Sequence, residues 1–346
     1  MNEFLLGIIL VVVAGVLEGL FSMGVTRTPK WQFENIWGLG SLIALVLVPW
    51  PLALLTVPEL GSVYADAGTG LILITILCGV GWGLGGIFWG KAIAAVGMAL
   101  GVSLLMGFIN VFGSVGPMAI MEPAKLSTGG GMTLMGAVAI MIVGVVIISV
   151  AGKLKEKELY AGTQNEEASG QATPFMVGLL FCVLSGVLSA LVNFGFIYGA
   201  PLGEAAAKTG TSAWATGFAV WALVFTGNYA VNFIYAVVLM IKNKTAGLIL
   251  SEGKPIYWFW ALFMGIAWPG GIAVYGMAAN KMGAYGAYAA FPMMLLVSIL
   301  TGNAAGALTG EWKGTSQRPR TWMIGGVAVL GVAFVVLGIA NKLMAA

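Results

Sequence analysis

The chain has 346 residues, of which 60% are hydrophobic and only 8% are Asp, Glu, Lys or Arg, whereas soluble domains carry about 25% charged residues. A water-soluble protein cannot hide this much apolar surface, so a soluble enzyme is excluded and an integral membrane protein is indicated. The net charge is only +3 and there are no His residues. We therefore expect no nucleic-acid partner, no cofactor and no His-based metal or acid–base site.

Ten stretches are long and apolar enough to cross a membrane, which needs about 20 such residues for a helix. Nine of them contain no Asp, Glu, Lys or Arg, and the first contains one charge, Glu18. Their continuous apolar character favours helices over the alternating strands of a membrane barrel. We predict an all-α polytopic membrane protein with ten transmembrane helices, in the stretches 4–26, 35–58, 67–90, 92–121, 126–152, 168–203, 209–241, 255–280, 282–310 and 321–341.

Basic residues give the orientation of these helices, because cytoplasmic loops are enriched in Lys and Arg. The loops that follow the odd-numbered spans contain twelve of the sixteen basic residues, and the termini and other loops contain the remaining four. This bias predicts that both termini face outward. Trp and Tyr near the ends of the stretches predict an interfacial belt, made of Trp31, Trp37, Trp50, Tyr64, Tyr257, Trp258, Trp260, Trp312 and Trp322.

The two halves of the chain resemble each other. Gly7 to Leu17 and Gly178 to Leu188 both read G-x7-G-V-L, and Trp82-x2-Gly-Gly-Ile is repeated as Trp268-x-Gly-Gly-Ile. We predict a first five-helix repeat in 1–152, a cytoplasmic linker in 153–173 and a second repeat in 174–346. An odd number of spans per repeat inverts one half relative to the other, and inverted repeats are typical of secondary transporters.

Glu18 is the only acidic residue inside a predicted span. An ionised carboxylate in the membrane costs several kcal/mol unless it is solvated or paired, so a group there suits the binding and release of protons. Gly15 and Gly19 flank Glu18 and leave room for a substrate or for a neighbouring helix. We interpret Glu18 as the proton-coupling residue; the alternative is a structural carboxyl that is hydrogen-bonded to another helix.

Amides and aromatic rings inside the spans are the candidate substrate ligands. Amides offer donors and acceptors to sugar hydroxyls, although each could instead bond a neighbouring helix. Aromatic rings stack on the C–H face of a sugar or on an organic cation, although each could instead pack or contact lipid. The candidate residues are Asn110, Asn193, Asn228, Asn232, Trp82, Trp89, Trp221, Trp268 and Tyr275; Trp82 and Trp268 stand out because the repeat pairs them.

Several ordered motifs that include polar residues resemble the L-rhamnose/proton symporter family of the drug/metabolite transporter superfamily. The resemblance covers most of the chain and rests on Arg27-x2-Lys30-Trp31-x2-Glu34-x2-Trp37, Gly131-Met-Thr-Leu through Lys153-Leu-Lys-Glu156, Glu204-Ala-Ala-Ala207, and Glu311-Trp312 with Arg318-Pro319. It implies two inverted five-helix repeats and uptake of a deoxy sugar with a proton across a bacterial inner membrane.

Our leading hypothesis is therefore a multi-pass inner-membrane transporter, not an enzyme, that couples entry of L-rhamnose or a related monosaccharide to protons by alternating access. Its partners would be the sugar, the proton and membrane lipid. An alternative is a proton-antiport exporter of metabolites or organic cations, in which Glu18 among aromatic rings would bind the cation. A non-transporting scaffold or sensor is disfavoured by the repeat and by the acid within the membrane.

Overall fold

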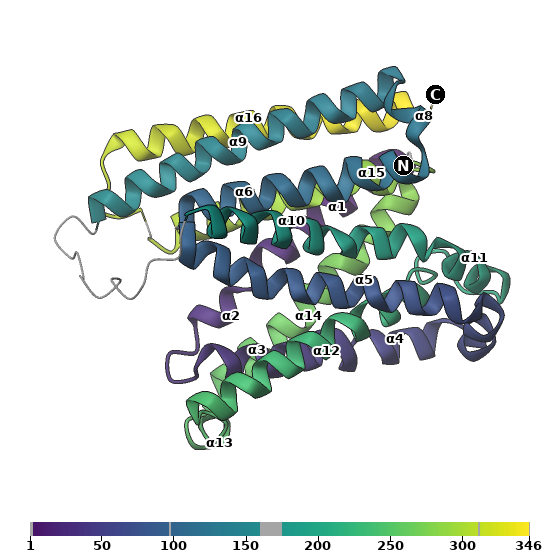
Figure 1. Ribbon diagram of the computed structural model, residues 1–346, viewed down its shortest axis with the longest axis horizontal. Coiled ribbons are helices and arrows are strands. Elements are labelled where there is room, and N and C mark those ends of the chain that lie inside the picture. The colour runs from purple at the N-terminus through teal and green to yellow at the C-terminus, as the bar shows by residue number, and fades with distance from the viewer. Residues whose placement is uncertain (1–2, 97, 160–174, 311, 346) are drawn as a thin grey trace.

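The computed structural model describes residues 3–96, 98–159, 175–310 and 312–345. Within these residues, ten helical segments are long and apolar enough to cross a membrane, as the sequence predicts. The regular elements of this part of the chain are all helices, and most of them run along the long axis of the molecule (Figure 1).

The first half contains five spanning segments, and three of them are interrupted. The segments and the short helices between them are α1 (Glu3–Leu20), α2 (Met23–Thr26), α3 (Phe33–Leu42), η1 (Ile43–Leu47), α4 (Pro49–Thr56), α5 (Leu60–Val96), α6 (Met98–Asn110), η2 (Val111–Val115), α7 (Gly116–Met121), α8 (Pro123–Leu126) and α9 (Gly129–Leu159).

The interruptions have local causes. η1 and η2 are single π-helical turns, and each is followed within two residues by a proline, Pro49 or Pro117, which cannot donate the next helical hydrogen bond. Gly68 has a φ of 80°, a left-handed value that favours glycine, and it separates the start of α5 from the long spanning part. The spanning part begins where the stretch 67–90 predicts it.

The second half contains five further spanning segments, α10 (Phe175–Tyr198), α12 (Phe218–Asn243), α14 (Pro255–Lys281), α15 (Gly286–Leu308) and α16 (Gln317–Ala345), with two short helices, α11 (Ala200–Lys208) and α13 (Leu248–Ser251). The preceding helix α9 continues to Leu159, into the stretch predicted as the linker 153–173. The rest of that stretch lies outside the described residues.

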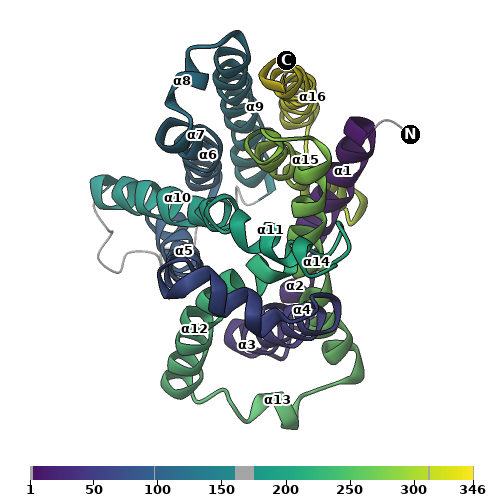
Figure 2. The same cartoon turned by 90° about the vertical axis from the view of Figure 1, so that its right-hand side faces the viewer.

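Helix packing follows the same scheme in the two halves. α1 packs on α14 and α15, and α10 packs on α5 and α6; α3 packs on α12 and α14, and α12 packs on α3 and α5. Figure 2, viewed along the long axis, shows the α1–α14 and α5–α10 pairs on opposite sides of the bundle. This exchange of partners supports the internal repeat, while the inversion of one half relative to the other stays a prediction.

Glycines set the closeness of these crossings. An ideal Cβ on Gly19 of α1 would lie 2.6 Å from Cβ of Thr301, and Gly15 faces Val297 in the same way. Both partner residues are on α15. Of the two explanations open at the sequence level, Gly15 and Gly19 therefore make room for a neighbouring helix rather than for a substrate.

Candidate functional site

Trp82 and Trp268, which the repeat pairs in sequence, meet in the middle of the bundle. Their ring centroids are 5.7 Å apart in an edge-on arrangement. Trp268 also stacks on Phe21 at 5.2 Å and lies 5.4 Å from Trp37, and Trp82 lies 6.0 Å from Phe225. We call these five residues the aromatic cluster. It joins α3, α5, α12 and α14 to the turn after α1.

Two of the predicted amide ligands form one wall beside this cluster. Asn228 and Asn232 are one turn apart on α12, and Asn232 Nδ2 donates to Asn228 Oδ1 at 2.5 Å. Trp37 Nε1 donates to Asn232 Oδ1 at 2.6 Å. Both amides are buried. These bonds occupy both side-chain oxygens and Asn232 Nδ2 in this conformation, so a sugar that binds these atoms would have to replace the protein groups.

Glu18 lies beside the aromatic cluster, across the crossing of α1 and α14. An ideal Cβ on Gly271, three residues after Trp268, would lie 2.8 Å from Glu18 Oε1 and 3.1 Å from the carbonyl oxygen of Ala14. The side chain is half-buried, and its Oε1 atom is buried without a hydrogen-bond partner among the described residues. The alternative was a structural carboxyl that is hydrogen-bonded to another helix. The Oε1 atom makes no such bond among the described residues.

The equivalent crossing in the other half has a different side chain. Gly85, three residues after Trp82, faces Ser189 of α10 as Gly271 faces Glu18, and Ser189 follows Gly-Val-Leu as Glu18 does. The carbonyl of Gly85 also accepts a hydrogen bond from Ser185 Oγ at 2.8 Å. The same glycine-lined contact thus occurs in both halves, with a carboxyl side chain at the α1–α14 contact and a hydroxyl side chain, Ser189, at the α5–α10 contact.

Asn193 and Tyr275 form a second group, nearer the end of the bundle that is predicted to face outward. Tyr275 OH donates to Asn193 Oδ1, and Asn193 Nδ2 donates to the carbonyl oxygen of Gly113 in η2 at 2.6 Å. Tyr275 is two helical turns, about 10 Å, from Trp268 along α14. This network ties α10, α14 and η2 together.

Aromatic packing fills the space around that network. Phe196 stacks on Trp221 with centroids 4.7 Å apart, and Tyr275 lies 5.5 Å from Phe196 and 5.8 Å from Phe291. Trp221, Tyr275 and Phe291 are at most 2% exposed. We call Phe196, Trp221, Tyr275, Phe291 and Asn193 the outer plug.

The remaining two predicted ligands lie apart from the aromatic cluster and from the outer plug. Asn110 Nδ2 donates to the carbonyl oxygen of Met106 on its own helix at 2.7 Å, directly before η2. Trp89 packs in the contact of α5, α6 and α10, beside Leu105 and Cys182.

Trp37, which was predicted to lie in the interfacial belt, points into the bundle, where its ring packs on Trp268 and its indole N–H donates to Asn232 Oδ1. The sequence feature that could have indicated an interior position is that Trp37 lies within the charge-free stretch 35–58. Trp31 is also buried, donating to the carbonyl oxygen of Leu248 at 3.0 Å. Phe21 and Phe225 were not predicted, since nothing in the sequence separates them from other apolar residues.

Polar contacts join two loops at the opposite end from the outer plug. Lys30 Nζ lies 2.7 Å from Glu252 Oε2, and this hydrogen bond raises the pKa of Lys30. Thr245 Oγ1 donates to Glu34 Oε1 at 2.7 Å, and Asn35 Nδ2 donates to the carbonyl oxygen of Thr245 at 3.0 Å. These contacts hold the start of α3 against the segment between α12 and α14.

Comparison with known proteins identifies the family. A sequence model described as L-rhamnose-proton symport protein matches residues 1–345. The chain belongs to this family. It is 27% identical to the L-rhamnose-proton symporter of Yersinia pestis, over 98% of each chain. It is also 27% identical to the L-rhamnose-proton symporter of Mannheimia succiniciproducens, over 98% of this chain and 99% of that protein.

Family membership and the helices agree on where the protein resides. Full-length similarity to bacterial symporters and ten apolar spanning segments among the described residues make it a multi-pass protein of the bacterial inner membrane. Like the other members of its family, it is a transporter.

Proposed function

We propose that this protein imports L-rhamnose, or a closely related monosaccharide, together with a proton by alternating access. The observation that carries the proposal is that Glu18 Oε1, a carboxyl oxygen without a hydrogen-bond partner in the described part of the chain, lies beside the aromatic cluster. The relatives that this chain matches over almost their full length are named L-rhamnose-proton symporters.

The aromatic cluster and the amides offer the two kinds of contact that a deoxy sugar needs. The rings of Trp82 and Trp268 present flat apolar faces to C–H groups. Asn228 and Asn232 present donors and acceptors to hydroxyls, once the bond from Trp37 to Asn232 opens. Sugar binding would therefore break contacts between α3 and α12 and couple occupancy to helix movement.

Glu18 would couple the proton to the same movement. It is placed on α1 against α14, which also carries Trp268, so its protonation changes the charge at the crossing that borders the sugar. A ligand drives such a cycle only through its different affinities for the two conformations. We expect the neutral, sugar-loaded protein to cross between them, and the ionised protein without sugar to do so rarely.

The observed packing supports a conformation that is closed toward the outside. The outer plug is almost fully buried, whereas Phe21, Trp37 and Trp82 of the aromatic cluster are half-buried. In this conformation the outer plug separates the aromatic cluster from the end predicted to face outward. In the outward-open conformation, the residues of the outer plug would have to move apart.

The exporter alternative rests on one observation, the half-buried carboxyl of Glu18 beside aromatic rings, a setting that also suits an organic cation. The named relatives favour sugar symport over it. Acidification of the external medium on adding a cation would favour export, and alkalinisation on adding sugar would favour symport.

The test is uptake of labelled L-rhamnose into proteoliposomes with an imposed inward proton gradient. We expect accumulation above the external concentration, which collapses when a protonophore removes the gradient. A preparation that is correctly folded and inserted, yet accumulates no L-rhamnose under the gradient, would refute uptake of this sugar.

A further inference from the structure

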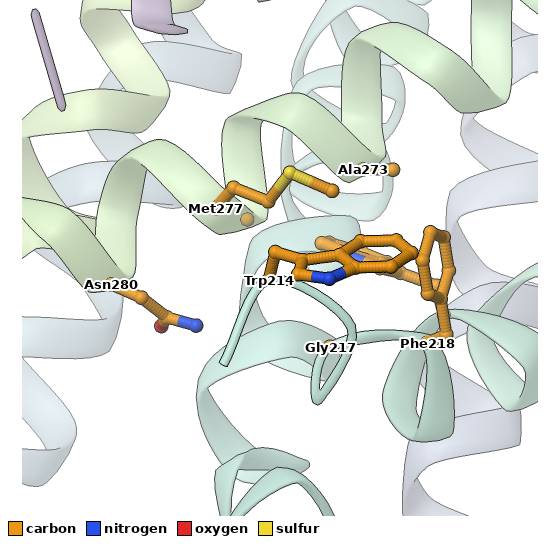
Figure 3. Close-up of a pocket in the computed structure, with 8 residues that line it drawn as sticks. Trp214, Gly217, Phe218, Ala273, Met277 and Asn280 are labelled. Atoms are coloured by element: carbon orange, nitrogen blue, oxygen red, sulfur yellow. The ribbon is translucent and has the colours of Figure 1, made fainter. Parts of the chain in front are cut away.

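A small hollow lies at the end of the bundle that is predicted to face outward, beside the outer plug. Its walls come from α14 and from the start of α12 with the turn before it, and include Trp214, Gly217, Trp221, Gly276, Met277 and Asn280. Figure 3 shows Asn280 and Met277 of α14 on one side and the indole of Trp214 next to them. No Asp, Glu, Lys or Arg is among its lining residues.

A hydrogen-bond donor in the wall of this hollow has no partner. Trp221 is 1% exposed, and its Nε1 atom is buried without a hydrogen-bond partner among the described residues. Buried donors are nearly always paired, so an unpaired one indicates a group that binds there. Stacking on Phe196 at 4.7 Å and on Phe225 at 5.6 Å holds the ring in place.

Two glycines lie close to this donor. An ideal Cβ on Gly276 would lie 2.9 Å from Trp221 Nε1, and one on Gly217 would lie 3.5 Å from it. A side chain at either position would cover the indole N–H. The hollow therefore exists because glycine occupies both positions.

The dimensions and chemistry of the hollow select a hydroxyl group as its occupant. The volume is about 10 Å³, room for one water-sized group. Trp214 beside it is 52% exposed and offers a ring face, and the amide of Asn280 is exposed as well. A hydroxyl that fills the hollow can accept from Trp221 while its ring lies over Trp214; the uncharged walls favour a neutral ligand over an ion.

We propose that this hollow is a second, outer sugar subsite, in which a neutral monosaccharide inserts one hydroxyl against Trp221 Nε1 and stacks on Trp214. The assignment rests on the proposed function for the identity of the sugar. In the observed conformation the outer plug is closed, so the subsite is available while the aromatic cluster is shut off from outside. It would hold sugar at the entrance before the outer plug opens.

The test is L-rhamnose binding to the purified full-length protein in detergent, followed by saturation-transfer NMR, which detects weak sites. We expect two saturable phases. Trp221→Phe keeps the stacked ring but removes the N–H, and should weaken the weaker phase about 3- to 10-fold, the effect of one lost hydrogen bond. Gly217→Ala fills the hollow with a methyl group at ordinary contact distance and should remove that phase.

Trp322→Phe, at an exposed Trp of α16, is the matched control and should change neither phase. A single phase that neither Trp221→Phe nor Gly217→Ala affects would overturn the subsite and leave the hollow as a water site. Equal loss of both phases in Trp221→Phe, with none in Gly217→Ala, would assign Trp221 a structural role only.

The two proposals fail in different ways. If the tighter phase is absent but the weaker phase responds to Trp221→Phe and Gly217→Ala, uptake of this sugar is refuted while the subsite stands. If the wild-type protein shows no L-rhamnose binding at all, both proposals are overturned. If only the weaker phase is absent, the subsite fails and the proposed function is unaffected.

Discussion

At the residue scale, Glu18 is the only acidic residue in the predicted spans, and its Oε1 atom has no hydrogen-bond partner among the described residues. The corresponding position of the second repeat is Ser189, which cannot exchange a proton near neutral pH. Of these two matching positions, one at each helix crossing, only Glu18 has a carboxyl group. One coupling residue per chain suits coupling to a single proton.

Replacing Glu18 by Gln should abolish proton-driven accumulation but keep sugar exchange. Gln resembles the protonated carboxyl in shape and charge, so the neutral, loaded protein should still cross between conformations. A proton gradient of one pH unit can support at most about tenfold accumulation at one proton per sugar, and the variant should remain near a ratio of one. Uptake and counterflow in proteoliposomes measure the two activities separately.

Glu122→Gln is the control for this variant, because Glu122 is an exposed acid at the end of α7. It should accumulate sugar as the wild type does. Gradient-dependent accumulation that persists in Glu18→Gln would show that another group carries the proton.

At the element scale, the crossings of α1 with α14 and of α10 with α5 depend on glycine at one face of each pair. Gly271 and Gly85 touch the opposite helix, whereas their sequence neighbours do not: a Cβ on Gly270 would meet only Leu17 Cδ1 at 3.8 Å, and one on Gly86 would meet nothing within 4 Å. The double-glycine motif therefore contains one packing position and one free position in each half.

We expect Gly271→Ala and Gly85→Ala to destabilise the protein and Gly270→Ala and Gly86→Ala to leave it unchanged or slightly more stable. The first two place a methyl group within 2.8 Å of Glu18 Oε1 or 2.7 Å of the Ser189 nitrogen, and such overpacking costs about 1–3 kcal/mol. In the other two, Ala replaces Gly in a helix without a clash, which favours folding by up to about 1 kcal/mol.

Thermal unfolding with a thiol-reactive dye measures this, since Cys78 and Cys182 are both free and buried in the folded chain. The two variants of each half form matched pairs. Equal shifts in melting temperature for all four would contradict the crossing geometry described above.

At the scale of the whole molecule, the two ends of the bundle differ in their closing contacts. One end is filled by the buried outer plug, and the other is joined by exposed and buried polar contacts, among them Lys30–Glu252 and Thr245–Glu34. Figure 1 shows the chain termini and α11 toward one end, with α2 and α13 toward the other. The Lys and Arg bias predicts that the α2 and α13 end faces the cytoplasm.

Reporter fusions should therefore give opposite results at the end of α16 and within 153–173. We expect alkaline phosphatase to be active and green fluorescent protein to be dark after α16, because the Lys and Arg bias predicts that this end faces outward, and the reverse within 153–173. Cell-based assays of both reporters at both positions provide internal controls. Bright fluorescence after α16 would invert the orientation and would place the outer plug on the cytoplasmic side.

The ten spans could be predicted, because they depend on a local pattern, the length of the apolar stretches. The repeated motif also singles out Trp82 and Trp268, whose rings meet in the structure. The bond between Asn228 and Asn232 also follows a local rule, since residues four apart share one helix face. Asn110, Trp89, Asn193 and Tyr275 were grouped with them by residue type alone, and residue type does not say which neighbouring helix a side chain faces.

Composition and hydropathy by themselves were enough for the fold class, the number of spans and the membrane location, because the energy of moving apolar or charged groups into lipid depends on each stretch separately. The place of Trp37, the contact of Glu18 with Gly271 and the division of the predicted ligands between the outer plug and the aromatic cluster depend on the tertiary structure. In lipid every face of an apolar helix is equally acceptable, so only packing between helices selects the residues that meet.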